Sequence, residues 1–223
     1  MHFYHISKLV PFTRDDYFFL EVIVMKKRIN VYRLVLLALF AAISSVLMYL
    51  EFALPIFPGF LKLDFSEFPA LIAAFMFGPL GGIAVALVKN LLHLPVSLTG
   101  GVGELANFVI SSALVGTAGL IYKFRKTKSG ALIGMAAGTV AMCVTGFLAN
   151  YFVMLPLYDR VMGFTEEKIV AISSAIIPFI KNKFDVVLWS ITPFNLFKGI
   201  IMSTITFLLY KHLSTLIKKT PAA

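Results

Sequence analysis

The sequence has few charged residues for its length. Lysine, arginine, aspartate and glutamate make up 14% of its 223 residues, whereas a soluble domain carries roughly a quarter. Hydrophobic residues account for 59%, and the mean hydropathy is +0.90. Several apolar runs approach the ~20 residues that a helix needs to cross about 30 Å of hydrocarbon. These features exclude an ordinary soluble domain and indicate a membrane protein.

Several motifs are also missing. The sequence has no strands of alternating polarity, so the membrane segments are expected to be helices rather than a barrel. Its single cysteine, Cys143, cannot form an internal disulfide. G-x-x-x-x-G-K-[ST], H-E-x-x-H and G-x-S-x-G motifs are absent, which removes a P-loop, a zinc protease site and a nucleophile elbow. We therefore expect a binder or transporter that is not an enzyme and needs no cofactor.

The charge that is present is mostly positive. The chain has 20 lysine and arginine residues against 11 acidic ones, and the basic residues flank apolar runs in short clusters. Membrane helices are sorted so that such clusters lie in the cytoplasm, which explains the charge better than a nucleic-acid partner does. The clusters at 26–28, 123–128 and 211–219 predict six spans in a bacterial cytoplasmic membrane, with both termini cytoplasmic.

The first 24 residues differ from the rest. They mix charged and aromatic residues, and a second methionine, Met25, then precedes a basic cluster. We interpret 1–24 as an N-terminal extension or upstream start, and 25–223 as a six-helix membrane domain. The alternative for 1–24 is an amphipathic helix that lies on the membrane surface.

The predicted spans differ in length, and the two short ones cover only about 16 Å and 21 Å at 1.5 Å per residue. Neither of these crosses a bilayer straight. Residues 156–192 are expected to lie outside the membrane, with an interfacial helix whose isoleucines recur at helical spacing. The six spans are expected at about 31–50, 67–77, 81–94, 104–122, 131–155 and 193–213.

The first external segment, 51–64, has an unusual composition. It contains too much proline and glycine for a helix, yet it is too apolar for a solvated loop. Irregular backbone at membrane depth is tolerated only against protein or around a cavity. We therefore expect a buried loop that folds over the mouth of the bundle, with Asp64 or Ser66 capping the next helix.

Polar residues concentrate in the outer halves of the predicted spans. Since polar groups in lipid must find partners, they are expected to converge on an outward-facing pocket under the first external loop. The asparagines among them suit a neutral, flat ligand with an amide-like edge. The alternative is a set of bridges, such as Lys89 with Glu104, that only holds the helices together. The polar residues are Lys89, Asn90, His93, Glu104, Asn107, Asn150, Asn195 and Lys198.

Small residues four apart form two helix faces. Ala38 and Ala42 lie on one face of the first span, and Gly134 and Gly138 lie on one face of the fifth. Such faces allow another helix to approach closely. They are expected to mark helix contacts within the bundle or with another subunit.

Four segments resemble the substrate-binding S components of energy-coupling factor (ECF) vitamin transporters, in particular the riboflavin-binding S component. The resemblance covers about residues 27–215. The segments are PGFLKLDFSE (58–67), KNLL (89–92), GVGELANF (101–108) and PFNLFKG (193–199).

This resemblance implies a bundle that binds riboflavin, as transported ligand, from outside. The face with Ala38 and Ala42 matches the docking face for the transmembrane coupling subunit, which two ATPase subunits drive. Flavin mononucleotide (FMN) is a second candidate ligand, and Lys89 and Glu104 are expected to support the pocket. The implied riboflavin contacts are Phe60, Leu63, Asn107, Asn150, Asn195 and Lys198.

Three other hypotheses remain open at this point. One is an S component for another vitamin, such as thiamine or a folate. Another is a standalone secondary transporter in which Lys89, His93 and Glu104 form a proton relay. The third is a membrane scaffold without a ligand, in which the polar residues only join helices.

Overall fold

The structure is a computed structural model that describes residues 31–219, with side chains described from 31 to 210. The expected extension 1–24 and the basic cluster 26–28 lie outside the described residues. The chain divides into two compact units, Met1–Val35 and Leu36–Ala223. All of the features below belong to the second unit, except the first residues of helix α2 (Val31–Tyr49).

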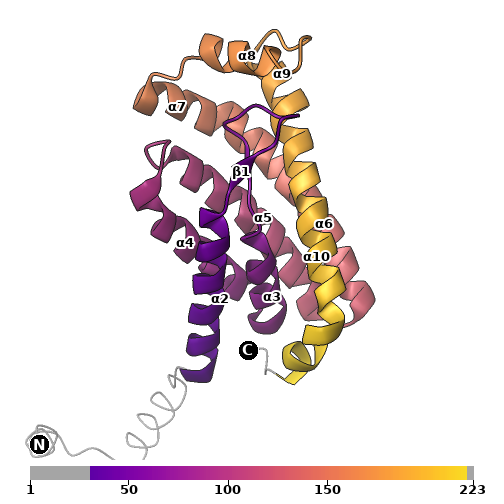
Figure 1. Cartoon of the computed structure of the whole chain (residues 1–223). Coiled ribbons are helices and arrows are strands. Elements are labelled where there is room, and N and C mark those ends of the chain that lie inside the picture. The colour runs from indigo at the N-terminus through magenta and orange to yellow at the C-terminus, as the bar shows by residue number, and fades with distance from the viewer. Residues whose placement is uncertain (1–30, 220–223) are drawn as a thin grey trace, which may run out of the picture. The chain divides into compact units, whose positions relative to one another are not determined.

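Helices make up most of the described chain (Figure 1). The α-helices after α2 are α3 (Glu67–Phe77), α4 (Pro79–His93), α5 (Val102–Phe124), α6 (Lys128–Ala149), α7 (Leu155–Met162), α8 (Glu166–Ser174), α9 (Lys183–Val186) and α10 (Thr192–Lys219). The shorter turns are a 3₁₀ helix, η1 (Leu94–Val96), and two π-helical turns, η2 (Asn150–Met154) and η3 (Val187–Ile191).

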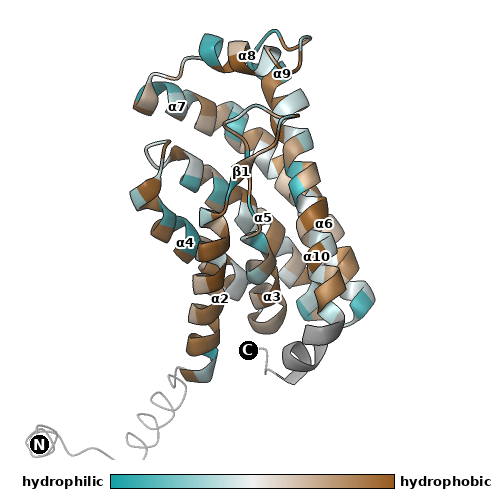
Figure 2. Ribbon diagram, in the orientation of Figure 1, coloured by the Kyte–Doolittle hydropathy of each residue, from teal (hydrophilic) through white to brown (hydrophobic). Residues whose placement is uncertain are grey.

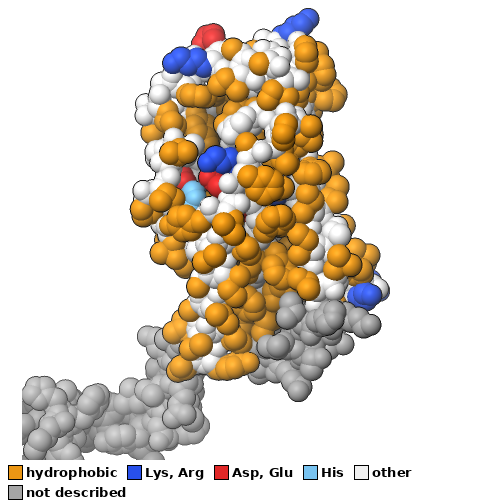
Figure 3. All heavy atoms as spheres, in the orientation of Figure 1, with side chains coloured by type: hydrophobic (Ala, Val, Ile, Leu, Met, Phe, Trp, Pro, Cys, Tyr) orange, Lys and Arg blue, Asp and Glu red, His pale blue; other side chains and the backbone are white. Residues whose placement is uncertain are grey.

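Five helical stretches of the described chain are long and apolar enough to cross a membrane. They are Val31–Tyr49, Pro79–Val96, Val102–Phe124, Lys128–Met162 and Lys183–Tyr210. Helix α3 is apolar too, but it has only 11 residues. Figure 2 shows that α2 is hydrophobic along most of its length, and large apolar side chains also cover much of the face seen in Figure 3. Such an apolar exterior suits contact with lipid rather than water, and the prediction of an all-α membrane protein is confirmed.

Helix α3 forms the centre of the bundle. It packs against α4, α5 and α10, and the side chains from Ala70 to Phe77 are almost completely buried. Its bounds agree with the predicted short helix. Because α3 begins in the interior, the polar residues at its N-terminus also lie inside the protein. This placement leads directly to the site described below.

Helices α5 and α6 approach each other closely through the predicted glycine face. A Cβ at Gly134 would lie 2.8 Å from the carbonyl oxygen of Ala118, and one at Gly138 would lie 2.6 Å from that of Leu114. Real side chains do not come so near, so only glycine permits this helix spacing. The prediction that these two glycines mark a helix contact is confirmed.

The helices on either side of segment 156–192 extend further into it than the predicted spans, 131–155 and 193–213. Helix continues from α6 through η2 and α7 to Met162, and it resumes at α9, well before Pro193. Pro156 and Pro193 stand next to the predicted bounds, and a proline usually ends a helix because it lacks an N–H and its ring clashes with the carbonyl four residues earlier. Here a π-turn precedes each proline, with Leu155 N bonded to Asn150 O and Thr192 N to Val187 O. The wider turn relieves the clash and lets the helix pass through the proline.

The segment 51–64 forms a small hairpin. Its strands β1 (Phe52–Ala53) and β2 (Lys62–Leu63) are antiparallel, and Lys62 forms an ion pair with Glu51. The tip packs on α10 through Phe57, whose ring centroid lies 5.3 Å from that of Phe194. At the end of the hairpin, Asp64 Oδ1 accepts a hydrogen bond from the backbone N–H of Ser66, 2.8 Å away. Ser66 is the N-cap residue of α3, and its side chain makes no capping bond.

Candidate functional site

A cavity of about 360 Å³ lies between the hairpin and the helices that follow it. Its wall comes from the hairpin, α5, the continuous helix α6–η2–α7, and α10. Apolar side chains such as Phe60, Ile110, Met142 and Phe194 form much of the lining. Its volume falls within the range of small-molecule sites, which combine apolar walls with a few placed polar groups. Figure 3 shows lysine, acidic and histidine side chains gathered at a hollow in an otherwise apolar face.

Most of the predicted ligand contacts line this cavity. Leu63 does not; it lies beside the cavity in the apolar core, and only 3% of its surface is exposed. Of the two supporting residues, Glu104 lines the cavity, and Lys89 is buried behind the wall. Ala38 and Ala42 lie on an exposed face of α2, away from the cavity. The contacts that line it are Phe60, Asn107, Asn150, Asn195 and Lys198.

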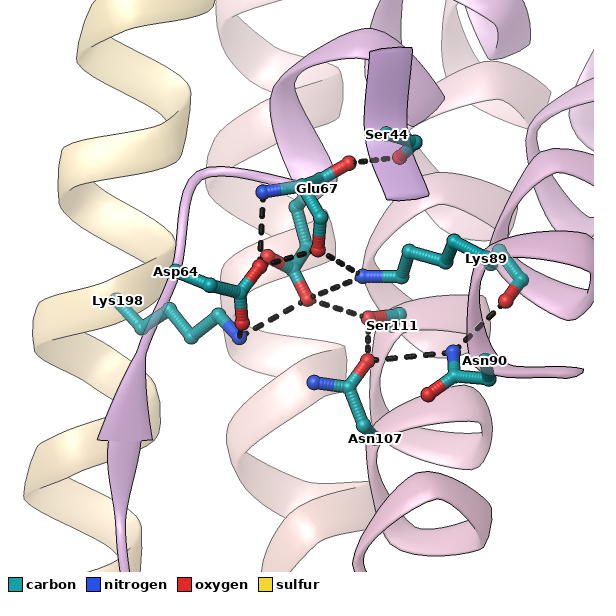
Figure 4. A network of polar contacts seen from close by, with 10 residues as sticks. Ser44, Asp64, Glu67, Lys89, Asn90, Asn107, Ser111 and Lys198 are labelled. Atoms are coloured by element: carbon teal, nitrogen blue, oxygen red, sulfur yellow. Dashed lines mark hydrogen bonds and ion pairs between the residues drawn. The ribbon is translucent and has the colours of Figure 1, made fainter. Parts of the chain in front are cut away.

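Four charged side chains form a buried cluster at the N-terminus of α3 (Figure 4). Glu67 Oε1 lies 3.0 Å from the Nζ atoms of both Lys89 and Lys198, and Lys198 Nζ also lies 2.8 Å from Asp64 Oδ2. None of the four side chains exceeds 3% exposure. The cluster contains two acids and two bases, so its charges balance. Balance matters because an unpaired charge in the interior costs several kcal/mol.

Serine hydroxyls complete the cluster. Ser66 Oγ donates to Asp64 Oδ1 and accepts from Lys89 Nζ, and Ser44 Oγ of α2 donates to the backbone carbonyl of Ser66. Ser111 Oγ of α5 donates to Glu67 Oε1 at 2.6 Å. The cluster therefore joins the hairpin to α2, α3, α4, α5 and α10. It fixes the polar floor of the cavity to five helices at once.

Lys198 belongs to both the cluster and the cavity wall. Its ammonium has three N–H donors, and Asp64 and Glu67 are its acidic partners. One donor remains that a bound molecule could use. The two interpretations of the outer polar residues, as ligand contacts or as bridges between helices, are therefore compatible for Lys198.

A second set of hydrogen-bonded polar side chains lies at the junction of α4 and α5. His93 Nδ1 lies 2.9 Å from Glu104 Oε1, and Ser97 Oγ donates to Glu104 Oε2 at 2.7 Å. Thr99 Oγ1 also donates to Glu104 Oε2, at 3.2 Å. The suggested bridge between Lys89 and Glu104 is thus wrong, because each residue has a nearer partner on another element. Residues 93, 97, 99 and 104 close one side of the cavity with paired, not free, polar groups.

The three asparagines differ in how much of each amide is already used. Asn107 Oδ1 accepts from Asn90 Nδ2 at 3.3 Å and lies 3.2 Å from Ser111 Oγ, whose one proton is donated to Glu67. Asn150 Nδ2 donates to the carbonyl of Gly146 at 2.7 Å. Asn195 Nδ2 is buried and has no partner among the described residues. Each amide thus retains hydrogen-bonding capacity, which favours recognition of a ligand edge that has both donors and acceptors.

Two site residues carried no assigned role in the sequence interpretation. Glu67 accepts from two lysines and a serine, although it was only part of a quoted motif. A signal was available, because a carboxylate at the start of an almost wholly apolar helix needs buried partners. Gly146, which contacts two of the asparagines, had no sequence signal, since glycine is common in membrane helices.

The chain was compared with models of known protein families. Residues 32–210 match the family described as ECF transporter, substrate-specific component. The chain belongs to this family. It is therefore an S component, a multi-pass protein of the bacterial cytoplasmic membrane that acts in transport and is not an enzyme.

Two relatives of this S component are named as riboflavin transporters. A protein named Riboflavin transporter RibU from Staphylococcus aureus (strain TCH60) is 37% identical over 188 residues, which cover 84% of this chain and 93% of the relative. One named Riboflavin transporter FmnP from Bacillus subtilis (strain 168) is 31% identical over 197 residues, covering 87% and 98%.

A solved structure also matches. It is described as the S component of a bacterial ECF transporter, and its sequence is 35% identical to this chain. The match has a TM-score of 0.66 and covers 84% of this chain and 98% of that one. The bundle described above is therefore the fold of an S component.

Proposed function

We propose that this S component binds riboflavin and serves as the substrate-specific subunit for its ATP-driven uptake. The observation that carries the proposal is the cavity in which Asn150, Asn195 and Lys198 lie beside apolar side chains. The names of the relatives support the same ligand. The sequence has no P-loop of its own, so ATP hydrolysis would be the task of partner subunits.

The chemistry of the cavity suits riboflavin. The carboxylates that line the cavity, at positions 51, 64, 67 and 104, each have an ion-pair partner, and so do its lysines, Lys62 and Lys198. The cavity therefore presents amides and paired charges rather than free charge. Riboflavin is neutral, with an imide edge for the amides, an apolar dimethylbenzene end for the phenylalanine and leucine side chains, and hydroxyls for the remaining polar groups. Thiamine, a cation, and folates, which are anions, fit this balance less well.

The proposed contacts follow from the position of each residue. Asn150, Asn195 and Lys198 would hydrogen-bond the polar edge, Asn107 would donate through its amide nitrogen, and Phe60 would cover the ring. Leu63 would act indirectly, because it anchors β2 in the apolar core beneath the cavity. Lys89 and Glu104 would support the site through Glu67 and His93, respectively.

We further propose six spans, with α3 as the short one, and an outward-facing cavity covered by the hairpin. The support comes from α5. Its first turns line the cavity at Glu104 and Asn107, and its other end, after 23 residues or about 34 Å, leads into the basic turn 123–128. If that turn is cytoplasmic, as its charge favours, the cavity opens to the outside. Both chain termini would then lie in the cytoplasm.

The partners proposed are a transmembrane coupling subunit and two ATPase subunits. Ala38 and Ala42 lie four residues apart on an exposed face of α2, where small side chains would let a helix of the coupling subunit approach closely. FMN is proposed as a second ligand. Since no arginine among the described residues lines the cavity, we expect FMN to bind less tightly than riboflavin.

The first test is the visible absorption spectrum of the detergent-purified protein from riboflavin-containing medium, followed by denaturation and mass analysis of what is released. We expect about one flavin per chain. Ligand-free protein should then quench the fluorescence of added riboflavin. FMN should compete with riboflavin only weakly, and thiamine and folate should not compete. A colourless protein that also fails to quench riboflavin would overturn the assignment.

A further inference from the structure

Gly146 lies where α6 meets α10 beside the cavity residues Asn150 and Asn195, one turn before Asn150. A Cβ at this position would lie 2.3 Å from Asn195 Nδ2 and 3.3 Å from Asn195 Cγ. Its carbonyl oxygen accepts the hydrogen bond from Asn150 Nδ2. Gly146 is therefore in contact with the amides of two cavity residues on different helices.

The two contacts act differently. A carbonyl oxygen only accepts hydrogen bonds, so the bond to Gly146 fixes which end of the Asn150 amide faces α6. Its Oδ1 then points away from the α6 backbone. The Asn195 amide nitrogen, in contrast, occupies the space that a side chain at position 146 would fill, and it is buried without a partner.

We propose that Gly146 is a positioning residue for ligand recognition, which holds the amides of Asn150 and Asn195 in the orientation that the ligand reads. This inference rests on the proposed riboflavin function. The carbonyl of Gly146 orients one amide, and its missing side chain makes room for the other. A buried amide without a partner is unfavourable, and a ligand that supplies an acceptor would relieve it.

Close packing of helices does not account for Gly146. Side chains at Gly134 and Gly138 would meet backbone carbonyls of α5, which is the usual role of small residues between membrane helices. At Gly146 the nearest atoms belong to the side chain of Asn195, and the next contact is Ile110 Cδ1 at 3.6 Å, an ordinary distance. The steric constraint at this glycine thus comes from one polar side chain of the cavity.

The test is Gly146→Ala, measured by titration of riboflavin fluorescence. The added methyl group should displace the Asn195 amide and weaken binding at least about tenfold, as the loss of one buried hydrogen bond does. The matched control is Gly116→Ala in α5, where the nearest atom would be Ile83 Cδ1 at 3.4 Å, an ordinary contact. This control should bind within about twofold of the wild type, because its new methyl group displaces no polar atom.

A double variant separates positioning from packing. In the Asn195→Ala background the obstructing amide is gone, so adding Gly146→Ala should change the affinity by less than about twofold, and the melting temperature should stay level or rise because alanine favours helix. A further tenfold loss of affinity in that background, or wild-type affinity in the single Gly146→Ala variant, would overturn this inference and leave the proposed function unaffected. A wild-type protein that binds no flavin would overturn the proposed function and this inference with it.

Discussion

The residues Asp64, Glu67, Lys89 and Lys198 show what could and could not be derived from sequence at the scale of single side chains. The sequence predicted that the outer polar residues converge, and those of the cavity and the cluster do lie together. It did not predict the pairs, because partners 22 and 134 positions apart depend on tertiary distances. Lys89 pairs with Glu67 rather than Glu104 for this reason, and no sequence spacing reveals such a choice.

Removing one charge from this cluster should be costly. In the Lys89→Met variant, Asp64 and Glu67 would face only one buried cation, and loss of one partner from a buried ion pair costs about 3–5 kcal/mol. We expect a clearly lower melting temperature in detergent for the ligand-free protein. Lys126→Met, at an exposed position in the α5–α6 turn, is the control and should melt like the wild type.

The double variant Lys89→Met with Glu67→Gln restores the charge balance and should regain part of the lost stability. Replacing a balanced buried pair is often far less costly than breaking it. If Lys89→Met alone melts at the wild-type temperature, the cluster does not stabilise the fold.

Single substitutions at the cavity should affect binding. Asn195→Ala and Lys198→Ala are each expected to weaken riboflavin binding at least about tenfold, near 1.4 kcal/mol, since each leaves a buried group of the ligand unpaired. Isothermal or fluorescence titration measures this change. Thr206→Ala is the control on the same helix, because the Thr206 hydroxyl donates to the Met202 carbonyl of its own helix and does not line the cavity. Unchanged affinity in both cavity variants would remove these residues from the site.

At the scale of helices, the sequence predicts the bounds of an element correctly where the hydrophobic pattern alone decides the structure. The bounds of α3 agree, and α2 ends one residue before the predicted end of its span. The sequence does not predict that helix continues past Pro156 and Pro193, because a proline normally ends a helix. The π-turns that carry the helix past both prolines place Asn150 in one irregular turn and Asn195 just after the other. Local rules cannot predict such turns, because their cost is offset by tertiary packing.

The close contact between α5 and α6 leads to a prediction about stability. In Gly138→Ala the new methyl group would lie 2.6 Å from the carbonyl oxygen of Leu114, and the two helices would have to separate. Overpacking of this kind costs about 1–3 kcal/mol. We expect a lower melting temperature than for Gly116→Ala, whose methyl group finds space. Equal stability of the two variants would show that the helices adjust without strain.

At the scale of the whole molecule, topology is the main open prediction, and charge is its only sequence signal. It can be tested in the Cys143→Ala background, with a single cysteine placed at Leu98 beside the cavity or at Lys126 in the basic turn. Leu98 lines the cavity and is 75% exposed. A membrane-impermeant maleimide added to intact cells should label Leu98→Cys, and Lys126→Cys only after permeabilisation. The opposite pattern would place the cavity on the cytoplasmic side.

The balance of the cluster also has an electrical consequence. Moving one elementary charge through the membrane potential involves about 2.3 kcal/mol per 100 mV. The four side chains at 64, 67, 89 and 198 carry two charges of each sign and lie within contact of one another. A displacement of this group, empty or with a neutral ligand beside it, would therefore involve almost no work against the voltage. The resting potential of the cell would neither drive nor hinder the movement of these four side chains.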